Sequence, residues 1–251
     1  MNIVTYGGGT NSTALLIECV KRGISIDLIL FSDTGGERPH TYQYVKMFSR
    51  WLKEHDMPEI ITVRKGGNGE TLEEECLRMK TIPPIAFGFK TCSQKYKIQP
   101  IDKYLNNYEP AINIWSIGDK VTKLIGFDAG EPHRIKDFSD DKYEVEFPLV
   151  AWDMGRDECI RTITEAGLCL PGKSACFFCP SSRPSEIKQL QHVYPDLAER
   201  CKYMESNAKE TLKQVKGLGR NFSWTDLMEN EDMFEDEFSM TPELTCGCYD
   251  G

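Results

Sequence analysis

The stretch that decides the fold runs from residue 2 to residue 13 and reads Asn2-Ile3-Val4-Thr5-Tyr6-Gly7-Gly8-Gly9-Thr10-Asn11-Ser12-Thr13. Its first five residues are typical of a short buried strand, which three glycines interrupt. The following segment, 13–21, has the apolar spacing of a helix and ends just before Gly23, a common helix stop. This order predicts a strand that turns through a glycine-rich loop directly into a helix.

Further strand and helix signals alternate along the chain. Residues 26–32 and 60–63 are apolar runs of strand length, and residues 40–54 between them predict an amphipathic helix. A β-α-β-α-β order calls for a parallel sheet that helices cover on both sides. We expect another core strand at 121–127, and helices at 72–79, 98–105, 155–166 and 185–215.

These signals predict an α/β fold class: a Rossmann-like parallel sheet with helices on both faces, plus a smaller, cysteine-bearing, mostly helical C-terminal part. We place the α/β domain at 1–150 and the C-terminal region at 151–251, with an acidic segment at 226–237 and a Cys-Gly-Cys tail. The 251 residues suffice for a sizeable core, and their ordinary apolar content excludes a disordered chain, a collagen-like chain or a small disulfide scaffold.

The charge of the chain is −9, from 39 acidic and 30 basic residues. An acidic balance argues against nucleic acid as a default partner. Seven of the acids, however, lie within 226–237, which leaves 32 acids against 30 bases elsewhere, so a nucleic-acid substrate stays open. No signal peptide or membrane-spanning apolar run is present, and we therefore expect a cytoplasmic protein with no membrane partner. The sequence leaves the oligomeric state undetermined.

The glycine-rich loop is a candidate site for an anion. Glycines let a backbone approach a phosphate, and the free amides at the start of a helix point toward it. The loop has neither the lysine of a Walker A motif nor the glycine spacing of a dinucleotide fingerprint. A tight strand-to-helix turn with no ligand is the alternative. The residues concerned are Gly7, Gly8, Gly9, Thr10, Asn11 and Ser12.

Polar residues also follow the other predicted strands. They include Asp33, Thr34, Gly35, Glu37, Arg38, Glu131, His133 and Arg134. Ligands of open parallel sheets bind outside the carboxyl ends of the strands, so such loops can converge. Arg134 and His133 are candidates for phosphate or sulfate oxygens, Asp33 for a ribose, an adenine or a metal ion, and Glu131 for holding Arg134. Each is otherwise an ordinary solvated loop residue.

The ten cysteines are expected to be thiols in a reducing compartment, where a close pair favours metal binding or catalysis. Cys176 and Cys179 have the Cys-x-x-Cys spacing of a metal site, and both zinc and iron-sulfur clusters accept thiolates. The alternative is a chance pair of buried cysteines.

Five motifs in order resemble the phosphoadenylyl sulfate (PAPS) reductase-like family of the adenine nucleotide α-hydrolase superfamily, also called PP-loop ATP pyrophosphatases. The segment 7–12 is similar to the pyrophosphate loop, and 31–35 with 39–41 is similar to the second motif of that branch. The other matches are 92–100, 126–134 and 172–180, so the resemblance covers about residues 1–184.

The resemblance implies an adenine nucleotide, ATP or an adenylyl sulfate, bound at the loop residues and at Asp33, Thr34, Gly35, Glu131 and Arg134, with magnesium as a further candidate. It implies a 4Fe-4S cluster, or zinc, on Cys92, Cys176 and Cys179. The fourth ligand is open: Cys169, Cys201, Cys76 or a tail cysteine could supply it, or a cluster could keep one iron free for substrate or sulfide. The tail resembles the mobile tail of sulfonucleotide reductases, in which a thiolate attacks sulfur. The catalytic candidates are then Cys246, Cys248, His133 and Arg134, and a thioredoxin-like reductant or a sulfur donor is the expected partner.

The chain departs from the family pattern at four positions. Gly7 stands in place of a serine, Asn11 in place of an aspartate, Thr91 in place of a cysteine and Thr245 in place of a glutamate. A typical serine-rich loop is also missing. Three functions therefore remain: a reductase that releases sulfite, an ATP pyrophosphatase that adenylates a nucleobase in tRNA or DNA for sulfur transfer, and a non-catalytic nucleotide- or nucleic-acid-binding module with a structural metal site.

Overall fold

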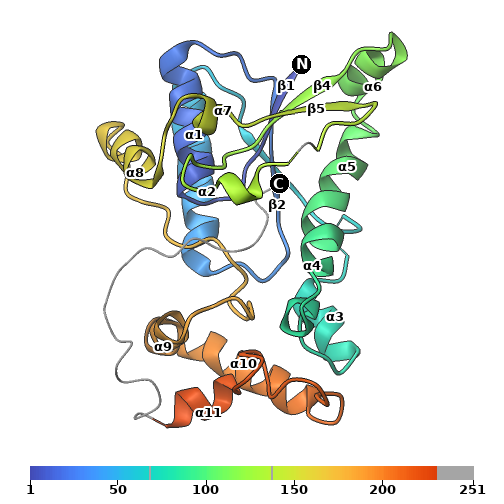
Figure 1. The fold of residues 1–251 in the computed structure, drawn as a ribbon, viewed down its shortest axis with the longest axis vertical. Helices are drawn as coiled ribbons and strands as arrows, with labels where there is room; N and C mark the ends of the chain where they lie inside the picture. Colours follow the sequence, from blue (N-terminus) through green and yellow to red (C-terminus); the bar gives the residue numbers. More distant parts are fainter. Residues whose placement is uncertain (68, 137, 231–251) are drawn as a thin grey trace.

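A five-stranded, fully parallel sheet forms the centre of the fold in the computed structural model, which describes residues 1–67, 69–136 and 138–230 (Figure 1). The strand order is β3-β2-β1-β4-β5, and β1 pairs Val4 with Ile29 of β2 and with Leu124 of β4. The predicted parallel α/β sheet is thereby confirmed. The strands are β1 Asn2–Thr5, β2 Leu28–Ser32, β3 Ile60–Val63, β4 Val121–Leu124 and β5 Tyr143–Glu146.

Helices cover both faces of the sheet because successive strand side chains point in opposite directions. Val4, Ile29 and Phe31 pack with the core of α1 (Thr10–Arg22), α2 (Pro39–Glu54) and α8 (Arg156–Glu165). The alternate residues Ile3, Leu28 and Leu30 pack with α5 (Gln99–Leu105) and α6 (Glu109–Ser116) on the other face. Figure 1 shows the two groups of helices on opposite sides of the strands.

A second core joins the C-terminal helices to α3 (Leu72–Arg78). Its buried members include Leu72 and Cys76 of α3 together with Ile187, Cys201 and Trp224. They come from α9 (Pro184–Val193), α10 (Pro195–Ala208) and α11 (Trp224–Glu229), which lie below the sheet in Figure 1. The smaller, mostly helical C-terminal part is thus confirmed, and one helix from the first half of the chain completes its core.

The remaining elements are short and connect the sheet to its helices. The predicted helix at 98–105 is confirmed as α5, and a continuous helical segment leads into it. The short elements are η1 (Pro84–Phe87), α4 (Thr91–Ser93), the π-helical η2 (Gln94–Ile98), η3 (Pro132–Arg134) and α7 (Pro148–Ala151).

Several boundaries differ from the predictions. Helix α1 starts at Thr10 rather than at residue 13, because the polar residues before its apolar stripe already form the first turn. The predicted helix at 185–215 is two helices that end at Ala208, since Pro195 follows Tyr194, whose backbone is not helical. Strand β4 stops at Leu124 instead of continuing to 127. Among the described residues, no helix has the length and apolar character needed to cross a membrane.

Candidate active site

The glycine-rich loop leads from β1 into α1 at the carboxyl edge of the sheet. Gly9 is the N-cap of α1, no side chain caps its amides, and the first turn carries no acidic residue. The first three amides of a helix have no partner within the helix, so those of Thr10, Asn11 and Ser12 are available to an anion. A methyl group placed on Gly9 would meet no atom within 4 Å, which leaves room in front of the loop.

The exit of β4 lies against this first turn, backbone to backbone. A Cβ atom on Gly126 would lie 2.9 Å from both the Cα and the amide nitrogen of Ser12, so only glycine fits there. The predicted loops at 7–12 and 126–134 therefore meet, although more than a hundred residues separate them in the chain. Their meeting brings the polar side chains that follow β4 to the start of α1.

Asn11 connects the two loops through its side-chain amide. Its Nδ2 donates to Asp128 Oδ2 at 2.9 Å and to Glu131 Oε2 at 3.3 Å, while its Oδ1 accepts from Arg156 Nη1 at 3.1 Å. Glu131 in turn forms an ion pair with Arg134 at 2.8 Å, as expected from the sequence. An asparagine at this position thus holds two carboxylates next to the first turn of α1.

His133 takes no part in this cluster. Its side chain is exposed and makes no hydrogen bond among the described residues. Arg134, one residue later, is half-buried, and its guanidinium lies 4.0 Å from the ring centre of Phe127. Of the two candidates for an oxyanion, only Arg134 is therefore held in a fixed position beside Asn11 and Glu131.

The carboxylate of Asp33 is occupied by internal donors. Oδ1 accepts from the Tyr42 hydroxyl at 2.8 Å and from the Gly35 amide at 2.7 Å, and Oδ2 accepts from Arg64 Nε at 2.7 Å. Its side chain is only 1% exposed. Asp33 therefore orders the loop after β2. That loop presents Thr34, whose hydroxyl lies 3.1 Å from the sulfur of Cys176.

The three predicted metal-binding cysteines line a single cavity. Cys92 comes from α4, and Cys176 and Cys179 come from the loop before α9. The cavity has a volume of about 30 Å³, and its walls are mainly apolar, with Thr34, Ser93 and Lys97 as polar members; its other lining residues are Leu72, Pro83, Ile85, Ala175, Phe178 and Pro180. Two segments 84 residues apart in the chain thus bring their thiols to the same place.

The donor chemistry of this cavity fits a thiolate-bound metal or cluster, since three thiols face apolar walls. Cys92, Cys176 and Cys179 are the residues that would hold it. In the described part of the chain, no three His, Cys, Asp or Glu side chains are grouped closely enough to enclose a metal ion as they stand. Ligation at this cavity would therefore draw the three sulfurs closer together.

Burial disfavours the ionised form of two thiols near the site. Burial, with the nearby carboxylate of Glu37 adding to it, raises the pKa of Cys176 well above its usual value. Burial likewise raises the pKa of Cys76 to about 12. Of the candidates for a fourth ligand, Cys76 and Cys201 lie in the helical core, and Cys169 is exposed. The tail cysteines Cys246 and Cys248 lie outside the described residues.

The cysteine loop is docked onto both strand-end loops. The hydroxyl of Ser174 donates to the carbonyl of Gly7 at 2.5 Å, and the amide of Phe177 donates to the carbonyl of Gly36 at 2.8 Å. Cys176 also forms an isolated antiparallel bridge with Glu37. The candidate phosphate loop and the thiol cavity consequently share their walls.

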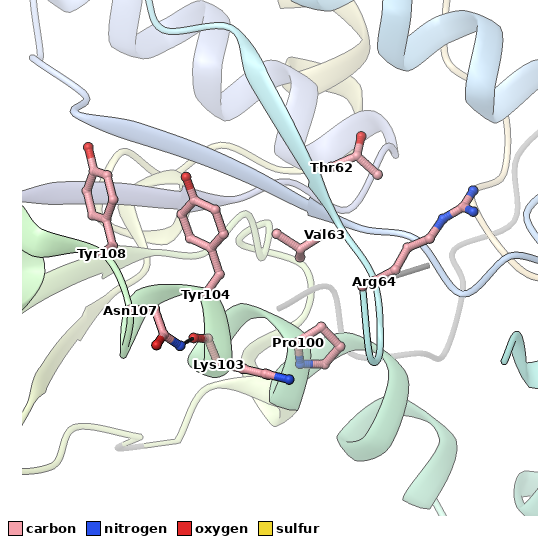
Figure 2. A pocket seen from close by; sticks show the side chains of 9 residues that line it. Thr62, Val63, Arg64, Pro100, Lys103, Tyr104, Asn107 and Tyr108 are labelled. Atoms are coloured by element: carbon pink, nitrogen blue, oxygen red, sulfur yellow. Dashed lines mark hydrogen bonds between the residues drawn. The ribbon is translucent and has the colours of Figure 1, made fainter. Parts of the chain in front are cut away.

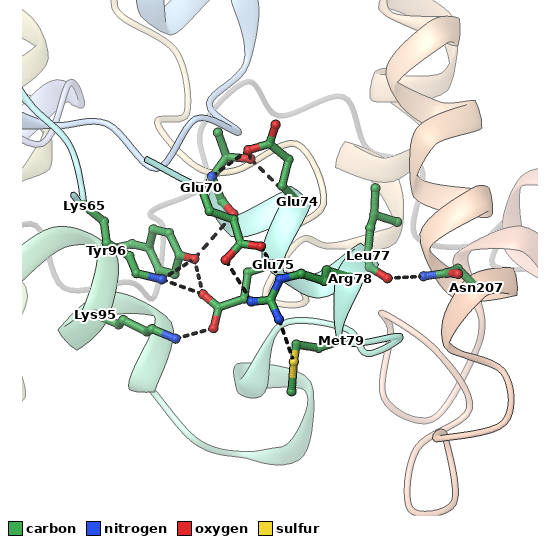
Figure 3. A network of polar contacts seen from close by, with 11 residues as sticks. Lys65, Glu70, Glu74, Glu75, Leu77, Arg78, Met79, Lys95, Tyr96 and Asn207 are labelled. Atoms are coloured by element: carbon green, nitrogen blue, oxygen red, sulfur yellow. Dashed lines mark hydrogen bonds and ion pairs between the residues drawn. The ribbon is translucent and has the colours of Figure 1, made fainter. Parts of the chain in front are cut away.

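The segment that carries Cys92 is fixed to α3 by a network of charges (Figure 3). Glu75 of α3 accepts from Lys65 Nζ at 2.8 Å and also from Lys95 and the hydroxyl of Tyr96. Ser32, at the end of β2, donates to the carbonyl of Tyr96 at 2.8 Å. These contacts hold η2, and with it Cys92, beside the carboxyl edge of the sheet.

Arg38 is the most unusual charge near the site. It is 4% exposed, and its Nε and Nη2 atoms have no hydrogen-bond partner in the described part of the chain. It is the N-cap of α2, and Thr41, three residues later, contacts the glycine-rich loop beside Gly8. A buried cation without a partner is costly, so this position favours an anionic ligand.

Sequence reasoning missed Arg156, Tyr42 and Arg64. Arg156 reaches Asn11 across 145 positions because α8 packs on α1, and no local pattern marks it. Arg64 follows β3 directly, so its place at a strand end was the signal that could have found it.

No protein-family model matches the sequence, and no curated protein is significantly similar to it.

Proposed function

We propose that the chain is an enzyme similar to PAPS reductase, which binds an adenine nucleotide at the carboxyl edge of the sheet and carries out sulfur chemistry beside it. One observation carries the proposal: the loop that bears Cys176 and Cys179 hydrogen-bonds through Ser174 to the phosphate loop at Gly7. A thiol cavity that shares a wall with a phosphate cradle suits a substrate in which sulfur and phosphate are joined.

The phosphate group would lie in front of the first turn of α1. The amides of Thr10, Asn11 and Ser12 point toward that space, and a helix start favours negative charge. Arg134 supplies a positive charge that Glu131 fixes at 2.8 Å. It would stabilise the negative charge that accumulates on phosphate as it leaves.

The reaction would begin with a thiolate at Cys246 or Cys248. Its sulfur attacks the sulfur of the adenylyl sulfate, a sulfur-sulfur bond forms, and the bond from sulfur to the bridging oxygen breaks with both electrons left on the adenosine phosphate. A dithiol reductant of the thioredoxin type then supplies two electrons, releases sulfite and becomes a disulfide. Cys92, Cys176 and Cys179 would hold a zinc ion or cluster, which would supply a Lewis-acidic metal centre beside the sulfate.

Replacement of both tail cysteines by serine tests this function. We expect Cys246→Ser combined with Cys248→Ser to abolish sulfite release from adenylyl sulfate in the presence of thioredoxin and its reductase. Cys169→Ser, which alters an exposed cysteine, is the matched control and should retain activity. Undiminished sulfite release by the double variant would rule out the tail as the nucleophile.

A second function, cleavage of ATP to pyrophosphate with adenylation of a nucleobase, has its own support. Asp128 and Glu131 both contact the amide of Asn11, at 2.9 and 3.3 Å, and carboxylate oxygens are ligands that magnesium prefers. They replace the carboxylate that an aspartate at position 11 would provide. Magnesium-dependent release of pyrophosphate from ATP with a candidate acceptor, lost in Asp128→Asn, would favour this function.

Failure to bind either ATP or adenylyl sulfate in calorimetry would favour a binding module instead.

A further inference from the structure

A groove runs along the outer edge of the sheet, beside the site described above (Figure 2). It has a volume of about 640 Å³, within the range of small-molecule sites. One wall is the end of the edge strand β3, and the other is α5 with the turn after it. Its lining residues are Thr62, Val63, Arg64, Gly67, Pro100, Lys103, Tyr104, Asn107 and Tyr108.

Two tyrosine rings form the aromatic wall of this groove. Tyr104 and Tyr108 are stacked, with ring centres 5.8 Å apart and planes inclined by 26°, and Figure 2 shows them projecting in the same direction. Both rings are partly buried, and neither hydroxyl has a hydrogen-bond partner among the described residues. Such rings offer flat faces for a base and polar tips for its edge.

One lysine of the groove, Lys103, can meet an anion. Asp102, its neighbour in the sequence, is paired with Lys123 at 2.9 Å. Lys103 lies on the rim, exposed, and forms no ion pair within the described ranges. The rim of the groove therefore offers the positive charge of Lys103 to a phosphate.

Arg64 connects the groove to the active site. Its guanidinium is bound to Asp33 at the end of β2, and the same side chain lines the end of the groove. A ligand that lies in the groove would thus approach the carboxyl edge of the sheet, where the phosphate loop and the thiol cavity meet. The groove leads toward the site from the face that α5 covers.

We propose that this groove binds a nucleotide unit of single-stranded nucleic acid, with its base on the tyrosine wall and its phosphate beside Lys103. Proteins that bind single-stranded nucleic acids without sequence preference use aromatic rings for stacking and a basic rim for the phosphates. The binding site is inferred independently of the reaction. That the bound base receives sulfur rests on the second function proposed above, in which ATP adenylates a nucleobase.

The test is binding of a fluorescein-labelled 12-nucleotide single strand to the full-length protein, followed by anisotropy. We expect Tyr108→Leu, which keeps an apolar side chain, to weaken binding about tenfold, as for loss of one stacked base. Lys103→Gln should lower the slope of log affinity against log salt by about one, as for loss of one phosphate contact. Lys46→Gln, an exposed lysine on α2 on the opposite face, is the matched control and should change neither.

Three outcomes would overturn the proposal. These are no binding of the strand at about 50 mM salt, unchanged binding in both groove variants, and equal affinity for AMP and the strand, which would assign the groove to a free nucleotide. Affinity for ATP, measured by calorimetry on the same proteins, reports separately on the phosphate loop. A protein that binds the strand but neither ATP nor adenylyl sulfate would contradict the proposed function and leave the groove assignment standing.

Discussion

Gly126 lies where the end of β4 meets the first turn of α1, and no side chain fits there. A Cβ atom would be 2.9 Å from the backbone of Ser12, which cannot give way without moving the helix start. We expect Gly126→Ala to lower the free energy of unfolding by about 1–3 kcal/mol, as overpacking does, and to weaken nucleotide binding about tenfold or more. Thermal unfolding and calorimetry with ATP measure the two effects.

Gly9→Ala is the matched change at the other side of the same turn. A methyl group on Gly9 meets nothing within 4 Å, and its backbone angles suit any residue. Stability should therefore be unchanged or rise by up to about 1 kcal/mol. Nucleotide affinity should nevertheless fall, because the methyl group occupies the space in front of the amides. A nucleotide affinity equal to that of the unaltered protein would contradict the assignment of this loop as a phosphate site.

Arg38 gives a prediction in which stability and binding change in opposite directions. Its guanidinium is buried, and its Nε and Nη2 atoms lack hydrogen-bond partners in the described ranges, so hydrogen bonds at these atoms do not offset its burial. Arg38→Met removes the charge and keeps the apolar part of the side chain. We expect an increase of about 1–3 kcal/mol in the free energy of unfolding and a loss of anion affinity, measured with ATP and with adenylyl sulfate. A less stable variant with normal affinity would show that Arg38 has a structural role.

At the scale of single residues, the sequence predicted which polar residues lie at the strand ends, but not which partners their side chains contact. Asp33 was correctly placed at a strand end, but its carboxylate is bound by Tyr42 and Arg64, and those contacts depend on how α2 and β3 pack. Asn11 looked like a lost carboxylate, whereas it gathers Asp128 and Glu131. Long-range packing decides such partners, and one sequence contains no record of it.

Among the elements, α3 and η2 are joined by a carboxylate that should make their contact sensitive to acid. Burial alone would raise the pKa of Glu75, but hydrogen bonds from Lys65, Lys95 and Tyr96 outweigh it and lower that pKa from 4.5 to about 2. A lowered pKa in the folded protein contributes stability above pH 4.5, and this contribution is lost as the pH falls toward 2. Part of the acid sensitivity of the molecule should therefore come from this network.

Urea unfolding at pH 7 and at pH 3 measures that contribution. We expect Glu75→Gln to lower the unfolding midpoint at pH 7 and to reduce the difference between the two pH values. Glu54→Gln, at the exposed end of α2, is the control and should preserve the difference. If Glu75→Gln shows the same pH dependence as the unaltered protein, the network does not stabilise the contact between α3 and η2.

Elements with strong periodicity could be predicted, and short ones could not. The glycine turn and the apolar runs identified β1 and β2, because buried parallel strands are nearly continuous in apolar residues. The edge strand β3 is half-exposed, and the short apolar run at 60–63 identified it. Strand β5 is an edge strand of four residues, two of them glutamates, so Tyr143 and Val145 alone mark its buried side. The apolar run at 112–117 belongs to α6, which begins at Glu109 with Pro110 in its first turn.

At the scale of the whole molecule, the two cores are connected rather than separate. Helix α3, from the first half of the chain, packs in the C-terminal core, and Glu73 of α3 binds Arg200 of α10 through two nitrogens. Conversely, α8 lies beyond residue 150 and packs on α1, with Cys159 and Ile163 in the first core. Each half of the chain thus contributes one helix to the core of the other half. A domain boundary drawn from composition could not predict this exchange of helices, because the sequence does not show which apolar faces meet.

This exchange predicts that the described part of the chain unfolds as one cooperative unit. Trp224→Ala, deep in the C-terminal core, removes a fully buried ring and should cost about 3–5 kcal/mol. If the cores are coupled, amide hydrogen exchange in β1 and β2 should lose the same free energy of protection, although these strands lie in the other core. Tyr203→Ala, on the exposed side of α10 at 62% exposure, is the control and should change protection by less than about 0.5 kcal/mol. Strands that kept their full protection in Trp224→Ala would instead define two units that unfold independently.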